Sequence, residues 1–176
     1  YGHHPKEVAA TFEAMRQAWP DRRKVVVFQP HRYTRTRDLF EDFVEVLSTV
    51  DVLILLDIYT AGEDEIVGAN GQVLCRAIRV RGQVDPVFVK DREDLANILA
   101  GIVKVDDVIL TMGAGSVGQI AAELPEKLAD QQTYSMALFR SAIHPEFFNI
   151  EERTEVCHNG YDFEAWLFKG GHVLRF

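Results

Sequence analysis

Apolar residues in the first part of the chain alternate between continuous runs and helical spacing. Short aliphatic runs predict buried strands, whereas apolar residues at every third or fourth position predict amphipathic helices. Strands without polar alternation are typical of a parallel sheet that helices cover on both faces. We therefore predict a three-layer, Rossmann-like α/β domain with a mostly parallel sheet and right-handed crossovers over residues 1 to about 130. The predicted strands are 24–28, 52–57, 86–89 and 106–111, and the predicted helices are 5–19, 35–48, 72–81, 92–101 and 116–128.

Residues 131–176 differ in texture, with dense aromatic residues and no alternation of helix and strand. Asn159-Gly160 is a strong two-residue hairpin signal, and Lys169-Gly170-Gly171 can turn the chain again. This extension therefore predicts a connector followed by a small antiparallel β-meander. Because such a meander is marginal by itself, it must pack on the α/β domain, pair with a sheet edge or meet another chain. The predicted strands are Thr154–Cys157, Tyr161–Phe168 and His172–Phe176.

Composition and charge exclude several classes of protein. The net charge of −8 argues against a main role in nucleic-acid binding. No apolar run approaches the ~20 residues of a transmembrane helix, and no signal-peptide pattern is present. Cys75 and Cys157 lack neighbouring ligand pairs, so we expect free thiols in a reducing cytoplasm and no zinc site. The chain begins at Tyr1 without Met, and we expect it to be a piece of a longer protein.

Basic side chains crowd the turn between the first predicted strand and the helix that opens near Thr34. We call residues 31–35 the arginine turn. The carboxyl end of a strand is where open α/β sheets bind ligands, and the first turn of a helix offers N–H groups to anions. Arginines at that end do not stabilise the helix itself, which favours an anion site over a solvated basic loop. The basic residues are His31, Arg32, Arg35 and Arg37.

Three further segments carry candidate chemistry. The glycine loop 111–116 could let a phosphate approach the backbone, or it could be a tight turn where a helix packs close to its strand. His3 and His4 are adjacent in a loop and lack ligand partners at metal spacing, so hydrogen bonding to a polar substrate or helix capping is favoured over metal binding. The acidic run 63–65 is interpreted as a solvated loop in preference to a cation site.

These segments together resemble one known domain. In order and spacing they are similar to the carboxyl-terminal domain of the Mur ligase family, in particular of the members that join L-alanine to UDP-N-acetylmuramate. The resemblance spans residues 1 to about 130, and residues 131–176 resemble nothing identified. The stretches that carry it are YGHHPKE at 1–7, VVVFQPHRYTRTRDLF at 25–40, LLDIYTAGEDEI at 55–66 and LTMGAGSVG at 110–118.

The resemblance implies an ATP-dependent amide-forming reaction in cytoplasmic synthesis of peptidoglycan precursors. In such enzymes the lactyl carboxylate is phosphorylated and the amine of L-alanine then attacks the acyl phosphate, while the carboxyl-terminal domain closes over a central ATPase domain. Guanidinium groups suit carboxylate and phosphate oxygens, in agreement with the anion site above. Arg37 ranks lower, as a helix-surface residue. By resemblance, His3, Arg32 and Arg35 bind the substrates, and Tyr1, Gly113 and Gly115 lie near the nucleotide or substrate.

The chain also departs from the family pattern. The Asp that normally precedes this tyrosine is missing, and no GxxxxGK(S/T) phosphate-binding loop occurs in the 176 residues. The central ATPase domain and the amino-terminal UDP-binding domain are therefore absent from the chain. ATP and Mg are expected to act in the full-length enzyme, with no cofactor held tightly, no metal ligands and no complete catalytic set here. We expect the chain to be inactive by itself.

Two alternatives to a ligase fragment stay open. A stand-alone α/β module could bind a nucleotide or another anion through the arginine turn and the glycine loop without chemistry. Residues 131–176 could be a lineage-specific extension, or they could be an unrelated sequence joined to a natural domain by fusion or by deliberate construction, which would make the chain a chimera. In that case the extension could drive homo-oligomerisation through an exposed strand edge.

Overall fold

The computed structural model describes residues 2–104, 106–114, 116–124 and 128, together with the backbone of 164–169 and 172–175. Tyr1, Gly115, Cys157 and the Asn159-Gly160 turn lie outside the described residues. The elements follow in the order α1 Pro5–Ala18, β1 Lys24–Gln29, α2 Tyr33–Asp38, α3 Phe40–Leu47, β2 Val52–Leu56, α4 Gly71–Arg81, β3 Val87–Val89, η1 Arg92–Asp94, α5 Leu95–Ile102, β4 Val108–Gly113, β5 Glu164–Lys169 and β6 His172–Arg175. Residues 117–124 are helical as well.

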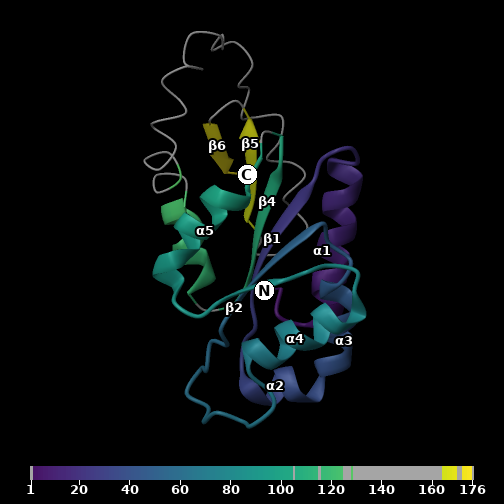
Figure 1. The fold of residues 1–176 in the computed structure, drawn as a ribbon, viewed down its shortest axis with the longest axis vertical. Coiled ribbons are helices and arrows are strands. Elements are labelled where there is room, and N and C mark those ends of the chain that lie inside the picture. The colour runs from purple at the N-terminus through teal and green to yellow at the C-terminus, as the bar shows by residue number, and fades with distance from the viewer. Residues whose placement is uncertain are drawn as a thin grey trace.

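The sheet has the order β3-β2-β1-β4-β5-β6, and its first four strands are parallel (Figure 1). The central strand β1 pairs with β2 and β4, as in the register Val27 with Ile54 and Phe28 with Met112. This confirms the predicted α/β class and parallel sheet. The order runs outward from β1 to β3 and then returns to β4 on the other side of β1. The strand order therefore reverses between β1 and β4.

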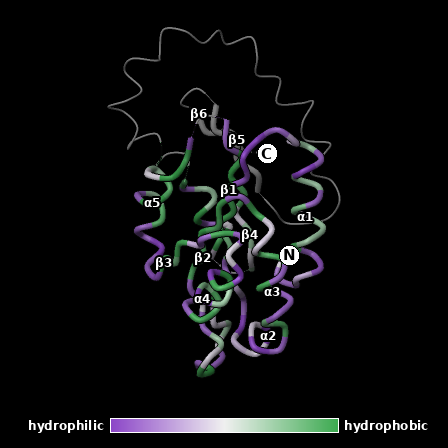
Figure 2. Tube along the Cα trace, turned by 45° about the vertical axis from the view of Figure 1, so that its right-hand side comes forward, coloured by the Kyte–Doolittle hydropathy of each residue, from purple (hydrophilic) through white to green (hydrophobic). Residues whose placement is uncertain are grey.

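Helices cover both faces of the sheet because its strands are apolar on both sides. One core lies beneath α1, α3 and α4, and a second lies beneath α5 and the helix at 117–124. Figure 2 shows the apolar residues gathered along the strands, with hydrophilic residues toward the outside of the helices. Among the described residues, no helix is long and apolar enough to cross a membrane. The largest fully buried side chains of the first core include Phe12, Phe28, Phe43, Leu47 and Leu74.

The predicted helix 35–48 is wrong in one respect, because the structure breaks it into α2 and α3 at Leu39. The backbone of Leu39 has φ −117° and ψ 26°, outside the helical region. Thr36, Phe43 and Leu47 are all buried and keep helical spacing across the break. Periodicity therefore could not reveal it.

Strands β5 and β6 extend the sheet beyond β4. β5 pairs antiparallel with β4, and β6 pairs antiparallel with β5, with Lys169 opposite His172. β6 falls within the predicted strand His172–Phe176, and β5 falls within the predicted strand Tyr161–Phe168 except for Lys169, which was predicted to be part of a turn. The first strand of the predicted meander, Thr154–Cys157, lies outside the described residues. The three-stranded meander, like the domain boundary near residue 130, stays a prediction.

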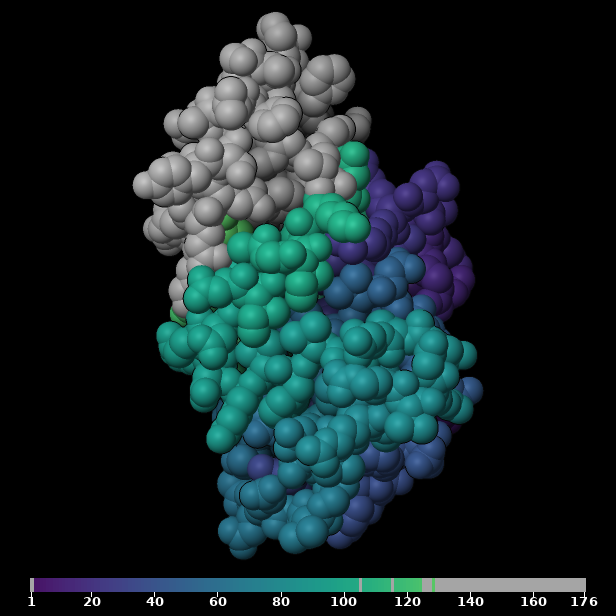
Figure 3. Space-filling view, viewed as in Figure 1, coloured from purple at the N-terminus to yellow at the C-terminus, as the bar shows by residue number. Residues whose placement is uncertain are grey.

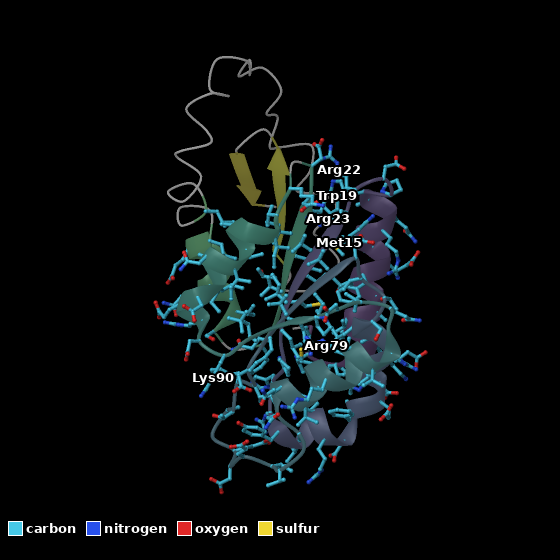
Figure 4. The ribbon with its side chains drawn as sticks, viewed as in Figure 1. Met15, Trp19, Arg22, Arg23, Arg79 and Lys90 are labelled. Atoms are coloured by element: carbon cyan, nitrogen blue, oxygen red, sulfur yellow. The ribbon has the colours of Figure 1, made fainter. Side chains whose placement is uncertain are left out.

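An ion pair joins the residues that directly precede β1 and β4, at the amino end of the sheet. The Arg23 guanidinium donates two hydrogen bonds to the Asp107 carboxylate, at 2.8 and 2.5 Å, and a third to the Ile102 carbonyl oxygen at 2.8 Å. Asp107 is buried, and its hydrogen bond raises the pKa of Arg23. Figure 4 places Arg22 and Arg23 at the end of the sheet opposite α2. The charges of Arg23 and Asp107 therefore neutralise each other at the amino end of the sheet. A ligand site is expected at the opposite, carboxyl end, as in other open α/β sheets.

Candidate functional site at the carboxyl end of the sheet

The predicted site segments converge on the carboxyl ends of β1, β2 and β4. β1 leads into the arginine turn, β2 leads into the loop 57–70, and β4 ends at Gly113. The amino-terminal residues reach the same end, because a Cβ placed on Gly2 would lie 2.9 Å from the Met112 side chain. In open α/β sheets ligands bind where the strand order reverses, which here is between β1 and β4. The arginine turn lies beside that point.

Within the arginine turn, Arg35 and His31 contact each other directly. Arg35 Nη1 lies 3.2 Å from His31 Nδ1. Because a guanidinium group can only donate, Nδ1 of His31 must be the accepting nitrogen, which fixes a neutral ring with its proton on Nε2. The ring also stacks on Tyr59 at a centroid distance of 5.4 Å and an interplanar angle of 8°. His31 is therefore held from two sides.

His3 and His31 both have a lowered pKa, so both rings are neutral at pH 7. Burial lowers the pKa of His31 below 6.5, and the Arg35 charge lowers it further. Burial and the Arg35 charge likewise lower the pKa of His3, whose ring centroid lies 6.1 Å from that of His31. The site thus combines permanent guanidinium charges with two uncharged imidazoles. Such rings can donate and accept hydrogen bonds near neutral pH.

We expect the His31 ring to titrate below pH 6.5 in the full chain, and to titrate at higher pH in Arg35→Ala. The shift upward follows because the variant removes a nearby positive charge that opposes protonation. Ring signals of labelled histidine, followed by NMR from pH 4 to 8, measure both values. Arg37→Ala is the matched control, since Arg37 pairs with Asp38 at 2.7 Å on the exposed surface. An unchanged His31 pKa in Arg35→Ala would contradict the geometry.

The amino-terminal loop is fixed by the Glu7 carboxylate. Glu7 Oε2 accepts hydrogen bonds from the backbone N–H groups of Gly2, His3 and His4 at 3.1, 3.1 and 3.2 Å. His4 caps α1 through Nδ1, which accepts from the Lys6 N–H at 3.3 Å. Capping was one of the interpretations left open for this histidine pair. The arrangement is a capping box, and it places His3 next to His31.

Glu7→Ala is expected to lower the free energy of unfolding by about 1–2 kcal/mol, since it leaves three backbone donors without their acceptor. Burial alone would raise the pKa of Glu7, but the three N–H donors outweigh it and lower the pKa below 4.5. A lowered pKa stabilises the fold above pH 4.5, and that contribution disappears as the pH falls through the lowered value. Urea unfolding at pH 7 and pH 3 measures both effects. Glu13→Ala, on the exposed face of α1, should leave the free energy of unfolding nearly unchanged.

Gly113 ends β4 and does not lie in a loop, which corrects the predicted strand 106–111. Its φ is +145°, and a Cβ there would lie 2.4 Å from the Gln29 carbonyl oxygen. Gln29 is its register partner on β1, and Ser116 Oγ donates to Gln29 Oε1 at 3.2 Å. These contacts show that β4 approaches β1 closely at Gly113, and both interpretations of the glycine loop stay open. The placement of Gly113 near a nucleotide stays a prediction, as does that of Gly115.

The acidic run is not simply a solvated loop, because Glu63 turns toward the arginine turn. Its carboxylate accepts from Thr34 N at 3.0 Å and from Thr34 Oγ1 at 2.7 Å. It also lies 3.6 Å from Arg32 Nη1. An N–H of the first turn of α2, expected to be free for an anion, is therefore occupied by the chain's own carboxylate. Anion binding by Arg32 and Arg35 stays a prediction.

Sequence reasoning missed two contributors, Tyr59 and Glu63. Both follow β2, the neighbour of β1 in the sheet, so their position after a strand end was the available signal. In the described part of the chain, no group of three or more His, Cys, Asp or Glu side chains could hold a metal ion. Cys75 is buried, and burial raises the pKa of its thiol.

Comparisons with known proteins agree on one family. A family model described as "Mur ligase, glutamate ligase domain" matches residues 1–115. The UDP-N-acetylmuramate–L-alanine ligase of Methylococcus capsulatus is 64% identical over 131 residues, which are 74% of this chain and 28% of that protein. The chain thus spans little more than a quarter of the length of this relative.

Solved structures share the fold at lower sequence identity. The UDP-N-acetylmuramate–alanine ligase of Thermotoga maritima matches 74% of this chain and 26% of its own, with a TM-score of 0.56 and 20% identity. A murein peptide ligase of Psychrobacter arcticus matches 73% of this chain and 26% of its own, with a TM-score of 0.53 and 16% identity. At these identities the likeness concerns the fold.

Proposed function

This chain belongs to the Mur ligase family, and from that membership we propose that it is the substrate-closing domain of an ATP-dependent ligase that joins L-alanine to UDP-N-acetylmuramate. The complete enzyme would act in the cytoplasm, in the synthesis of peptidoglycan precursors. The 64% identity to the Methylococcus capsulatus ligase favours this pair of substrates over those of other family members.

The observation that carries the proposal is the gathering of Arg32, Arg35, His3 and His31 where the strand order reverses. A guanidinium group binds a carboxylate or phosphate through paired N–H donors and stabilises negative charge that develops on it. Neutral imidazoles add directional hydrogen bonds without repelling the arginines. Arg32 and Arg35 would therefore bind anionic oxygens of the substrates, and His3 would hydrogen-bond a polar group nearby.

The remaining parts of the active site would come from the central and amino-terminal domains of the full-length enzyme. ATP and magnesium are assigned there, since this chain contains no phosphate-binding loop and its described residues offer no metal cluster. We propose that the chain alone does not catalyse ligation. Its contribution is to close over the bound substrates and bring the arginine turn to their charged groups.

A hybrid ligase tests the proposal. The full chain replaces the segment that it matches in the Methylococcus capsulatus ligase, and ADP release is measured with UDP-N-acetylmuramate and L-alanine. We expect the hybrid to turn over only when both substrates are present, and the separate chain to show no turnover. A folded hybrid without activity, or one that prefers another amino acid, would contradict the proposal.

A further inference from the structure

Glu63 reaches from the loop after β2 to the start of α2. Its two carboxylate oxygens are both used by Thr34, at 3.0 Å from the backbone nitrogen and 2.7 Å from the hydroxyl. One of them also lies 3.6 Å from Arg32 Nη1. The segments around residues 30–47 and 57–70 lie together at the lower end of the molecule in Figures 1 and 3. One side chain thus ties two strand ends together beside the candidate site.

The arginine turn contains one strained backbone conformation, at Arg32. Arg32 occupies the N-cap position of α2 with φ +71°, a left-handed conformation that costs free energy for any residue except glycine. Its side chain makes no capping hydrogen bond. Such a conformation persists only where surrounding contacts impose it. Within α2, the Arg32 carbonyl oxygen accepts hydrogen bonds from the Thr36 N–H at 3.1 Å and the Thr36 hydroxyl at 2.9 Å, and further constraint comes from the loop after β2.

The loop after β2 supplies that constraint. The Arg32 N–H donates to the Tyr59 carbonyl oxygen at 2.9 Å, and the Tyr59 N–H donates to the Pro30 carbonyl oxygen at 2.9 Å. These bonds fix the backbone before Arg32, and Glu63 fixes it immediately after, at Thr34. The loop therefore surrounds the strained residue on both sides. Of the loop contacts named here, that of Glu63 is the one made by a side chain, so it can be removed without changing the backbone.

Glu63 differs from its acidic neighbours in the same loop. Its side chain is 21% exposed, whereas Asp64 and Glu65 are exposed residues. The hydrogen bonds from the Thr34 amide and hydroxyl lower the pKa of Glu63, and the Arg32 charge adds to that effect. The carboxylate is therefore ionised at neutral pH. The pair with Arg32 leaves other N–H donors of the guanidinium group available to a ligand.

We propose that Glu63 is a positioning residue: it fixes Thr34 and Arg32 so that Arg32 and Arg35 project toward the ligand from a rigid start of α2. Its contact with the substrate is indirect, through the arginines. The inference rests on the proposed function for the identity of the ligand. The holding contact itself can be tested on the chain alone.

The first experiment uses the full ¹⁵N-labelled chain. We expect the Thr34 amide signal to follow the titration of Glu63 below pH 4.5, and to lose that step in Glu63→Gln. His31 and Arg32 also face Glu63. A change of the Thr34 signal caused by titration of His31 would persist in Glu63→Gln, whereas a change caused by titration of Glu63 would disappear, so the two causes can be told apart. Asp64→Asn is the matched control and should leave the Thr34 titration unchanged. A Thr34 amide that titrates identically in the original chain and in Glu63→Gln overturns the proposal.

The second experiment places Glu63→Gln, Glu63→Ala and Asp64→Asn in the hybrid ligase. In Glu63→Ala we expect KM for UDP-N-acetylmuramate to rise about tenfold. The rise should be smaller in Glu63→Gln, because the amide oxygen can still accept a hydrogen bond from Thr34. In both variants kcat should stay within about threefold of the parent hybrid. Asp64→Asn should match the parent hybrid. Unchanged KM values, or a loss of kcat alone, overturn the positioning role. A parent hybrid without activity contradicts the proposed function, and the Thr34 titration then still decides whether Glu63 holds the turn.

Discussion

Gly113→Ala is expected to lower the free energy of unfolding by about 3 kcal/mol or more. The backbone of Gly113 has φ +145°, which side chains rarely adopt, and an added Cβ would lie 2.4 Å from the Gln29 carbonyl oxygen. That oxygen belongs to the central strand, so it cannot move aside like the end of a flexible side chain. The strain and the overlap therefore add. Thermal or urea unfolding of the full chain measures the loss.

Gly101→Ala is the matched control for this prediction. Gly101 lies in α5, and a Cβ there meets nothing within 4 Å, so alanine should stabilise the chain by about 0.5–1 kcal/mol through helix propensity. The two substitutions add the same methyl group with opposite expected signs. If Gly113→Ala were as stable as the original chain, the close approach of β1 and β4 at this end would be refuted.

The sheet could be predicted from the sequence because its strands are continuous apolar runs. Val25–Phe28 and the run at 53–56 are buried on both faces, and burial on both faces leaves an unambiguous pattern. The break at Leu39 left no such pattern, since buried residues keep their spacing across it. Likewise β4 extends to Gly113 because Gly113 pairs with Gln29, and pairing depends on a partner strand that local sequence does not identify.

The candidate site could be predicted in part. The arginine turn was found because strand, turn and helix are contiguous in the sequence. Glu63 was interpreted as solvated because its partner Thr34 lies 29 residues earlier, and only the adjacency of β1 and β2 brings them together. The stacking of Tyr59 on His31 depends on the same adjacency. Contacts between strand ends require the strand order, which the pattern of apolar residues does not contain.

Arg35→Ala in the hybrid ligase is expected to lower kcat/KM by about 100- to 1000-fold. The variant removes a positive charge that would stabilise negative charge on the reacting carboxylate or phosphate. It also removes the hydrogen bond to His31 Nδ1, so the neighbouring ring loses one of its two supports. Arg35→Lys should recover only part of the rate, because an ammonium group keeps the charge but not the paired donors. Steady-state ADP release with both substrates measures these ratios.

The central claim is that the arginine turn of this domain binds a charged group of the ligase substrates, and one ratio tests it most directly. This ratio compares kcat/KM of the hybrid carrying Arg35→Ala with that of the hybrid carrying Arg37→Ala. Both residues lie on α2, but Arg37 pairs with Asp38 on the exposed surface. We expect Arg37→Ala to keep nearly full activity and Arg35→Ala to fall at least 100-fold below it. Equal activities of the two hybrids would contradict the claim.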